Sequence, residues 1–154
     1  MYKRILVPVD GSTTSNRALT SALQLARETG AQVRLLYVVE EMVYLSGYDQ
    51  FGVYSGDLTA IVRESGQKVL DDSMAIATAA GVQADHVLVD TFTQRLGDVV
   101  ADAAKAWSAD LVVVGTHGRR GIGRVLMGSG AEEIVRLAPV PVLVIRARDA
   151  VSQP

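Results

Sequence analysis

The sequence contains no cysteine among its 154 residues. Disulfides, thiolate zinc sites and cysteine nucleophiles are therefore excluded, and the composition is compatible with a reducing compartment. The formal net charge is −2, so we expect no general attraction to nucleic acid or to an anionic membrane. No apolar run approaches the about 18 residues of a membrane helix, and the amino-terminal apolar run is too short for a signal peptide. These absences predict a cytoplasmic protein.

Several motifs of nucleotide binding and catalysis are missing as well. The P-loop pattern GxxxxGK[ST] does not occur, and Gly121 and Gly123 are followed by Leu126 where GxGxxG requires glycine. Neither HExxH nor the GxSxG of serine hydrolases is present. The sequence therefore argues against a Walker-type NTPase, a classical dinucleotide site, a zinc hydrolase and a serine hydrolase.

Five short apolar runs alternate with helical patterns along the chain. Several of the runs are apolar without alternation, which is typical of parallel strands covered on both faces. Alternating strands and helices predict an α/β fold, an open parallel sheet with helices on both faces. The expected strands are 5–9, 33–39, 85–90, 110–115 and 141–146. The first expected helix starts after residues 12–14, and three further helices are expected at about 57–80, 96–107 and 129–138.

The periodicity also predicts which helical residues face the core. In the first helix Ser12, Thr13 or Thr14 is expected as N-cap and Gly30 as C-cap. We expect one domain over 1–147, with a frayed tail at 148–154. The inward residues expected in the later helices include Ile61, Val62, Val69, Leu70, Met74, Ala77, Val99, Val100, Ile134, Val135 and Ala138.

The stretch from Gly115 to Gly130, GTHGRRGIGRVLMGSG, is rich in glycine and arginine. It joins the end of an expected strand to the start of an expected helix. Helix amino termini present unpaired N–H groups and a partial positive charge, and glycines allow backbone amides to approach a ligand closely. The loop therefore predicts an anion site, for which phosphate is the commonest occupant. Its arginines, Arg119, Arg120 and Arg124, either meet the outer phosphates or are simply solvated.

Four residues of this loop, Gly115, Gly118, Gly128 and Ser129, have the spacing G-x2-G-x9-G-S. This spacing resembles the ATP-binding motif of the universal stress protein family. The resemblance extends over about residues 2–146 and includes ILVPVDGS, LLYVVE, ADLVVVGTHGRRG and GSGAEEIVRLAPVPVLVIR. Members that do not bind ATP typically lose the glycine pattern, so the resemblance favours the nucleotide-binding branch.

The resemblance implies a Rossmann-like sheet in the order 3-2-1-4-5, with ATP, or ADP or AMP, at its carboxyl edge. By position, Asp10 is expected near the ribose or a bound Mg²⁺; alternatively, it only caps the first helix. Val38 is expected to offer backbone groups to the adenine, and Pro8 and Val9 to line its pocket. The residues expected around the phosphates are Gly115, His117, Gly118, Arg119, Gly128, Ser129 and Gly130.

The resemblance further implies a homodimer formed through the last strand, Val140 to Arg146, which would otherwise be an exposed sheet edge. The sequence departs from the family after the third strand, where members often have a glycine and this chain has Asp90 and Thr91. This departure concerns one wall of the expected pocket.

Three functions remain open at this point. The first is a nucleotide-binding stress-response or regulatory protein. The second is a slow ATPase, although beside Asp10 no second group is identifiable that would position an attacking water. The third is a non-catalytic partner-binding module with an empty pocket or another ligand, in which the aromatic segment 44–54 is the contact surface.

Overall fold

The structure is a computed structural model that describes residues 1–40, 55–91, 93–117 and 127–146. Gly118, Arg119, the aromatic segment 44–54 and the tail 148–154 lie outside the described residues. The elements in chain order are β1 (Arg4–Pro8), α1 (Thr13–Thr29), β2 (Gln32–Val39), α3 (Ser55–Ala79), β3 (Ala84–Asp90), α4 (Leu96–Trp107), β4 (Leu111–Gly115), α5 (Ser129–Leu137) and β5 (Val142–Ile145).

The five strands form one sheet in the order β3-β2-β1-β4-β5, and every neighbouring pair is parallel. This confirms the expected fold class and strand order. On the central strand, Ile5 is paired with Val33 of β2 on one side and with Leu111 of β4 on the other. The chain reverses its direction of travel across the sheet between β1 and β4. In open sheets of this kind, ligands bind where the strand order reverses, beyond the carboxyl ends of the strands.

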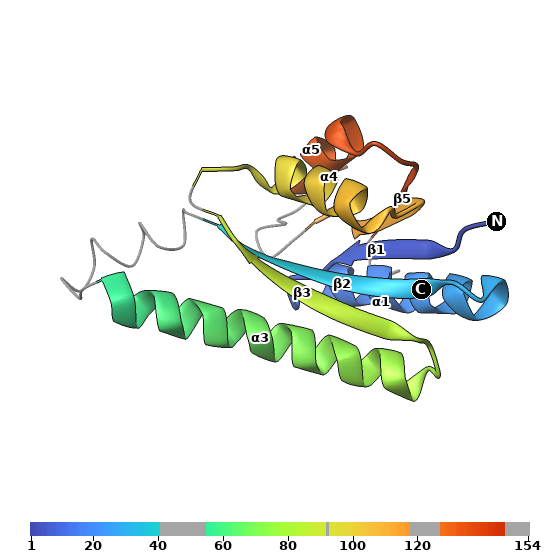
Figure 1. Ribbon diagram of the computed structural model, residues 1–154, viewed down its shortest axis with the longest axis horizontal. Coiled ribbons are helices and arrows are strands. Elements are labelled where there is room, and N and C mark those ends of the chain that lie inside the picture. Colours follow the sequence, from blue (N-terminus) through green and yellow to red (C-terminus); the bar gives the residue numbers. More distant parts are fainter. Residues whose placement is uncertain (41–54, 92, 118–126, 147–154) are drawn as a thin grey trace, which may run out of the picture.

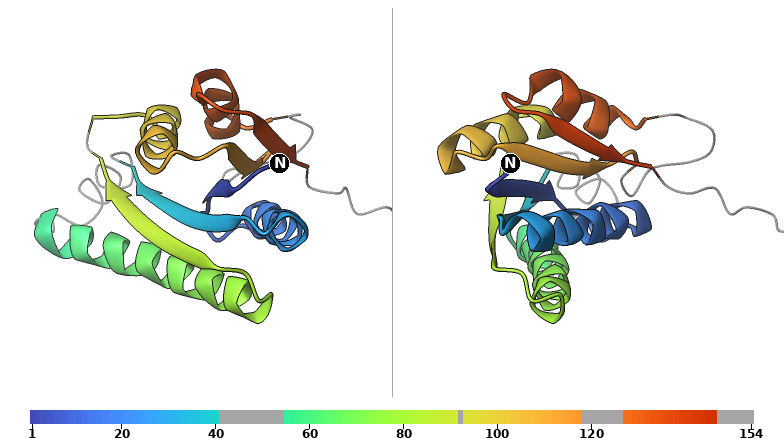
Figure 2. Two further views of the ribbon diagram at one scale, coloured as in Figure 1. Left: turned by 45° about the vertical axis from the view of Figure 1, so that its right-hand side comes forward. Right: turned by 90° about the vertical axis from the view of Figure 1, so that its right-hand side faces the viewer.

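Two helices cover each face of the sheet, as Figures 1 and 2 show: α1 and α3 lie on one face, and α4 and α5 lie on the other. Successive side chains of a strand point to opposite faces, so neighbouring residues enter different cores. Leu35 packs in the core under α1 and α3, whereas Leu36 packs in the core under α4 and α5. Both are fully buried, which explains why the strands are apolar without alternation.

The ends of α1 confirm the capping signals of the sequence. Ser12 is the N-cap residue, and its hydroxyl accepts a hydrogen bond from Ser15 N at 3.1 Å. Gly30 ends the helix in the left-handed region, with φ of 71°, where glycine has no steric penalty. Of the three possible N-caps, Ser12 therefore holds the position, and Thr13 and Thr14 lie within the helix.

Two residues expected in the core are exposed, and those two expectations were wrong. Ile61 of α3 is 61% exposed and Val135 of α5 is 42% exposed, whereas Leu70 and Ile134 on the same helices are fully buried. Val62, the next residue of α3, packs against the core under α1 and α3, so Ile61 lies on the side of the helix that is turned away from that core. Ile134, beside Val135 on α5, faces the core under α4 and α5, and Val135 lies on a side of the helix that no element of the described residues covers.

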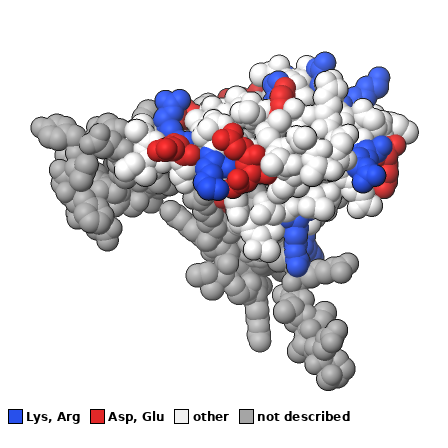
Figure 3. All heavy atoms as spheres, turned by 90° about the horizontal axis from the view of Figure 1, so that it is seen from below, with Lys and Arg blue, Asp and Glu red and all other residues white. Residues whose placement is uncertain are grey.

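The described surface carries charges of both signs. Figure 3 shows the molecule from below, and its blue and red side chains lie near one another among uncharged residues. Such mixing on this face agrees with the small net charge. Within the described residues, the helices are too short or too polar for any of them to span a bilayer.

Candidate functional site

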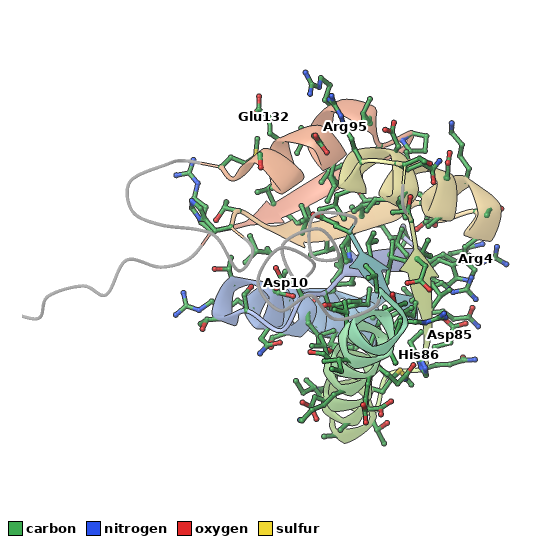
Figure 4. All side chains as sticks on the ribbon, turned by 90° about the vertical axis from the view of Figure 1, so that its left-hand side faces the viewer. Arg4, Asp10, Asp85, His86, Arg95 and Glu132 are labelled. Carbon is green, nitrogen blue, oxygen red and sulfur yellow. The ribbon has the colours of Figure 1, made fainter. Side chains whose placement is uncertain are left out.

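Asp10 lies in a tight turn between β1 and α1, at the carboxyl edge of the sheet that faces the viewer in Figure 4. Its Oδ1 accepts a hydrogen bond from Ser12 N at 2.9 Å, and its own N–H donates to Ser15 Oγ at 3.1 Å. Gly11 between them has φ of 81°, a conformation that favours glycine. The DGS sequence therefore forms a turn that holds the Asp10 carboxylate in a defined place, while Ser12 caps the helix.

Gly115 ends β4 and lies against Thr14 in the first turn of α1. A Cβ added to Gly115 would lie 2.7 Å from Thr14 Cγ2 and 3.0 Å from the backbone C and O of Thr14. Both residues are buried. Glycine is thus required here for the packing of α1 against β4, and this packing brings the Asp10 turn next to the end of β4.

The segment after β4 turns back onto the start of α5. Thr116 N donates to Ile145 O at 2.9 Å, and Thr116 O accepts from Gly128 N. The Thr116 hydroxyl is 3.0 Å from His117 Nδ1, so the ring lies beside this turn. A Cβ on Gly128 would come within 3.1 Å of Thr116 O, which leaves little room for any residue larger than glycine.

The amino terminus of α5 is built from small residues. Gly128 occupies the N-cap position and has no side chain with which to bond the first N–H groups of the helix. Ser129 is exposed, and a Cβ on Gly130 would lie 2.9 Å from Leu96 Cδ2 of α4. Ser129 and Gly130 therefore present the first N–H groups of α5 and the positive end of its dipole at the carboxyl edge of the sheet, an arrangement that suits an anion.

The residues expected around the adenine do not share one face of the sheet. The side chain of Val9 is 4% exposed and packs in the core under α1 and α3, whereas Val38 packs against the core under α4 and α5. Val9 N donates to Leu36 O at 2.9 Å and so continues the pairing of β1 with β2. Pro8, the last residue of β1, is partly buried. Val9 and Val38 therefore point their side chains to opposite faces of the sheet.

At the end of β3, where the resemblance implies a glycine, this chain has the polar residues Asp90 and Thr91. Asp90 forms an ion pair with Arg63 of α3 at 2.9 Å. Thr91 is buried, its N–H donates to Val39 O at 3.3 Å, and its hydroxyl accepts from Gln94 N at 3.0 Å. The β3–α4 connection is therefore fixed to β2 and to α3 by its own polar groups.

A second polar cluster lies at the opposite, amino-terminal side of the sheet. Arg34 bonds Asp85 through two nitrogens, at 2.8 and 2.7 Å, and its guanidinium stacks 4.7 Å from the centroid of the Trp107 ring. The hydrogen bond from Arg34 lowers the pKa of the Asp85 carboxyl below its ordinary value. Arg4 Nη1 donates to Trp107 O at 3.0 Å. This cluster attaches the end of α4 to the sheet and lies far from Asp10 in the strand direction.

Several residues that build the site were not expected from the sequence. Thr14 and Thr116 provide the surfaces against which Gly115 and Gly128 pack, and Glu133 of α5 accepts a hydrogen bond from Gly97 N of α4 at 3.3 Å. Local periodicity carries no signal for contacts of this kind. Within the described ranges, no group of three or more histidine, aspartate or glutamate side chains is arranged to hold a metal.

These features define a Rossmann-like α/β domain whose small-residue turns meet at the switch point between β1 and β4. The chain belongs to the universal stress protein family, because the model of that family matches residues 1–146. It is 32% identical over 146 residues to the universal stress protein MJ0531 of Methanocaldococcus jannaschii, which covers 95% of this chain and 83% of the relative.

Solved structures of the family have the same fold. A universal stress protein from Burkholderia pseudomallei is 36% identical, has a TM-score of 0.76, and covers 95% of this chain and 97% of its own. A family member from Arabidopsis thaliana with AMP bound is 22% identical, has a TM-score of 0.64, and covers 99% of this chain and 96% of its own. At such low identity, the second likeness concerns the fold alone.

Proposed function

We propose that this chain binds an adenine nucleotide, ATP in the first instance, and acts as a regulatory protein of the stress response. The observation that carries the proposal is the meeting of two turns across Gly115. The Asp10 turn and the Gly128–Gly130 turn are brought together because α1 packs directly on the end of β4. One turn offers a carboxylate and the other offers N–H groups, which are the complements of ribose hydroxyls and of phosphates.

The similar solved structures support an adenine nucleotide in particular. They include family members in complex with cAMP, with dAMP and with AMP. Those proteins share the fold of this chain, and each ligand contains adenine. In this chain, Val38 and Val9 would present backbone groups to the base, and Asp10 would accept from the ribose. Ser129 and Gly130 would donate to phosphate, and Gly128, whose own N–H donates to Thr116 O, would line the phosphate site without a side chain. Gly118 and Arg119, which lie outside the described residues, remain predictions for the same role.

Gly115 and His117 would have different roles in nucleotide binding, one in packing and the other as a hydrogen-bond donor. Gly115 is buried against Thr14, so its proposed contribution is to hold α1 in place rather than to touch phosphate. His117 is partly buried beside Thr116 and adjoins the turn that ends at Gly128. Its imidazole would provide a side-chain donor next to the backbone donors of α5.

A Mg²⁺ ion, if it accompanies ATP, would use Asp10. Mg²⁺ prefers an octahedral shell of oxygen atoms and is often held by one or two carboxylates together with phosphates and water. The Asp10 carboxylate fits such a shared role, since one of its oxygens already accepts from Ser12 N. When bound, the metal would neutralise phosphate charge. We therefore propose Asp10 as a metal ligand only in the presence of nucleotide.

We further propose that the protein is a homodimer formed through Val140 to Arg146. The two edges of the sheet differ: on β5 Leu143 is 40% exposed, and Val135 and Leu137 of the adjoining α5 are 42% and 40% exposed. The opposite edge strand, β3, exposes Asp85 and His86. Charged edge residues discourage strand pairing, whereas an apolar edge favours it. The β5 edge is therefore the one that suits a second copy of the chain.

Two alternatives are tested by the same experiment. A slow ATPase would release ADP and phosphate, and a partner-binding module would hold no nucleotide or a different ligand. The purified protein is denatured, and any released small molecule is identified by mass spectrometry; ATP, ADP, AMP and cAMP are then titrated by calorimetry. Release of an adenine nucleotide and binding of ATP support the proposal. Absence of both would refute it, and ADP formation above background would favour the ATPase.

Substitutions at the two turns locate the site. Asp10→Asn keeps the turn-forming oxygen but removes the charge, and Gly128→Ala places a Cβ within 3.1 Å of Thr116 O. Both are expected to weaken ATP binding. Arg34→Ala, at the far side of the sheet, is the control and is expected to leave ATP affinity unchanged. Equal affinity in all three variants would place the nucleotide elsewhere.

A further inference from the structure

The helix α4 has no side-chain cap of its own. Arg95 holds the N-cap position and makes no side-chain hydrogen bond to the first turn. The acceptor comes from another helix instead, because Gly97 N donates to Oε2 of Glu133, a residue of α5 that follows 36 positions later. A carboxylate at this place satisfies an orphan N–H and interacts favourably with the positive end of the helix dipole.

The two helices touch at the same point. A Cβ on Gly97 would lie 2.8 Å from Glu133 Cβ and 3.0 Å from the backbone C and O of Glu133. One turn earlier on α5, a Cβ on Gly130 would lie 2.9 Å from Leu96 Cδ2. Gly130 in the first turn of α5 and Glu133 one turn later thus lie against the first turn of α4, with two close contacts and one hydrogen bond.

The amino terminus of α5 is also attached to the end of β4, because Gly128 N donates a hydrogen bond to the carbonyl oxygen of Thr116, the residue after that strand. The helix has only nine residues, so few contacts determine where its axis points. Removal of the attachment to α4 would leave its amino terminus fixed on one side only. The direction of its first N–H groups depends on both attachments.

We propose that Glu133 is a positioning residue for nucleotide binding: it holds the amino-terminal half of α5 against α4, so that the N–H groups of Ser129 and Gly130 face the phosphates. This inference rests on the proposed function. Glu133 itself does not contact the nucleotide. Its negative charge opposes an anion nearby, whereas its hydrogen bond to Gly97 favours binding, so the two effects have opposite signs and can be separated.

The experiment compares two neighbouring glutamates by calorimetric titration with ATP, well below the unfolding temperature. Glu133→Ala removes the contact and the charge, whereas Glu133→Gln removes the charge and keeps an oxygen that accepts from Gly97 N. Glu132 lies in the first turn of α5, is exposed and points outward in Figure 4, so Glu132→Ala and Glu132→Gln are the matched controls.

Glu133→Ala is expected to weaken ATP binding on the order of fivefold, as loss of a hydrogen bond to a charged group would do when part of its effect reaches the site. Glu133→Gln is expected to bind ATP at least as tightly as the wild type, and neither Glu132 variant is expected to bind more weakly. Unchanged affinity in Glu133→Ala would overturn the inference. So would an equal loss in Glu133→Gln, because that variant keeps the oxygen that accepts from Gly97 N and the hydrogen bond would then not be what supports binding.

Amide hydrogen exchange without nucleotide provides the second measurement. Glu133→Ala is expected to accelerate exchange at Gly97, whose N–H loses its acceptor, while leaving exchange in β1 and β4 unchanged; unaltered exchange at Gly97 contradicts the inference. If Glu133→Ala fails to fold, Glu133→Asp replaces it, since the shorter side chain keeps the charge but retracts the acceptor. If the wild-type protein binds no adenine nucleotide, both the proposed function and this inference are refuted. If the wild type binds ATP and Glu133→Ala binds it with the same affinity, only this inference is refuted.

Discussion

Replacement of Gly115 by alanine is expected to destabilise the protein through overpacking. The added Cβ would lie 2.7 Å from Thr14 Cγ2 and 3.0 Å from the Thr14 backbone. The side-chain methyl can adjust, but the backbone atoms give way only if α1 moves as a whole. Overpacking of a buried site costs about 1–3 kcal/mol, and for a chain of this length about 2 kcal/mol lowers Tm by about 4–8 °C.

The cost at Gly115 comes from lack of space, because the described glycines with positive φ are Gly11, Gly30 and Gly81. Gly130→Ala is the matched control: its Cβ would meet only the end of the Leu96 side chain, at 2.9 Å, and that side chain can rotate. Alanine inside a helix is also favoured over glycine by about 0.5–1 kcal/mol. We therefore expect Gly130→Ala to be close to neutral in stability.

The assay is urea unfolding of both variants, together with calorimetric titration of ATP. The double variant Gly115→Ala with Thr14→Ser removes the methyl contact but keeps the backbone contact, so we expect partial recovery of stability. Since α1 carries the Asp10 turn, Gly115→Ala is also expected to weaken ATP binding. Wild-type stability in Gly115→Ala, or an equal loss in Gly130→Ala, would refute the reasoning.

Three further changes have expected outcomes. Ser12→Ala removes the N-cap of α1 and is expected to cost about 1 kcal/mol in urea unfolding; an unchanged midpoint would contradict the cap. Asp85→Asn removes the negative charge and one of the two oxygens that accept from Arg34. Because the folded pKa of Asp85 is lowered, its contribution is present above the unfolded pKa of about 3.9 and disappears as the pH falls through the folded value. The stability difference between wild type and Asp85→Asn, measured by Trp107 fluorescence, should thus be constant at neutral pH and vanish in acid, and a difference that persists in acid would count against the ion pair. Leu143→Lys places a charge on the β5 edge and is expected to convert the proposed dimer to a monomer in analytical ultracentrifugation; a dimer that survives would place the interface elsewhere.

The strands and helices were predictable because their signals are local. Val, Ile and Leu in unalternating runs predicted buried parallel strands, and the observed bounds of β2 and β3 begin one residue before the expected ones. The helix α4 covers the expected residues, Leu96–Trp107. Ser12 and Gly30 act through their own turns, so their capping roles can be recognised without knowledge of the rest of the fold.

The errors occurred where burial depends on a neighbour. Ile61 and Val135 adjoin core residues, yet both are exposed: Val62 and Ile134 beside them face the core, and Ile61 and Val135 lie on sides of α3 and α5 that no described element covers. A periodic pattern shows that one side of a helix is apolar. It does not show whether another element covers that side, and an apolar side left uncovered is a surface on which another copy can pack.

For the glycine-rich loop, too, some features could be predicted from the sequence and others could not. The sequence by itself determined that small residues stand between β4 and α5, and that an aspartate follows β1; both are properties of adjacent residues. Only the tertiary structure decided that Gly115 packs on Thr14, about a hundred residues earlier in the chain, and that Glu133 caps α4. The physical reason is that such contacts follow from the order of the strands, which places β4 beside β1 and α5 beside α4, and no local pattern contains that order.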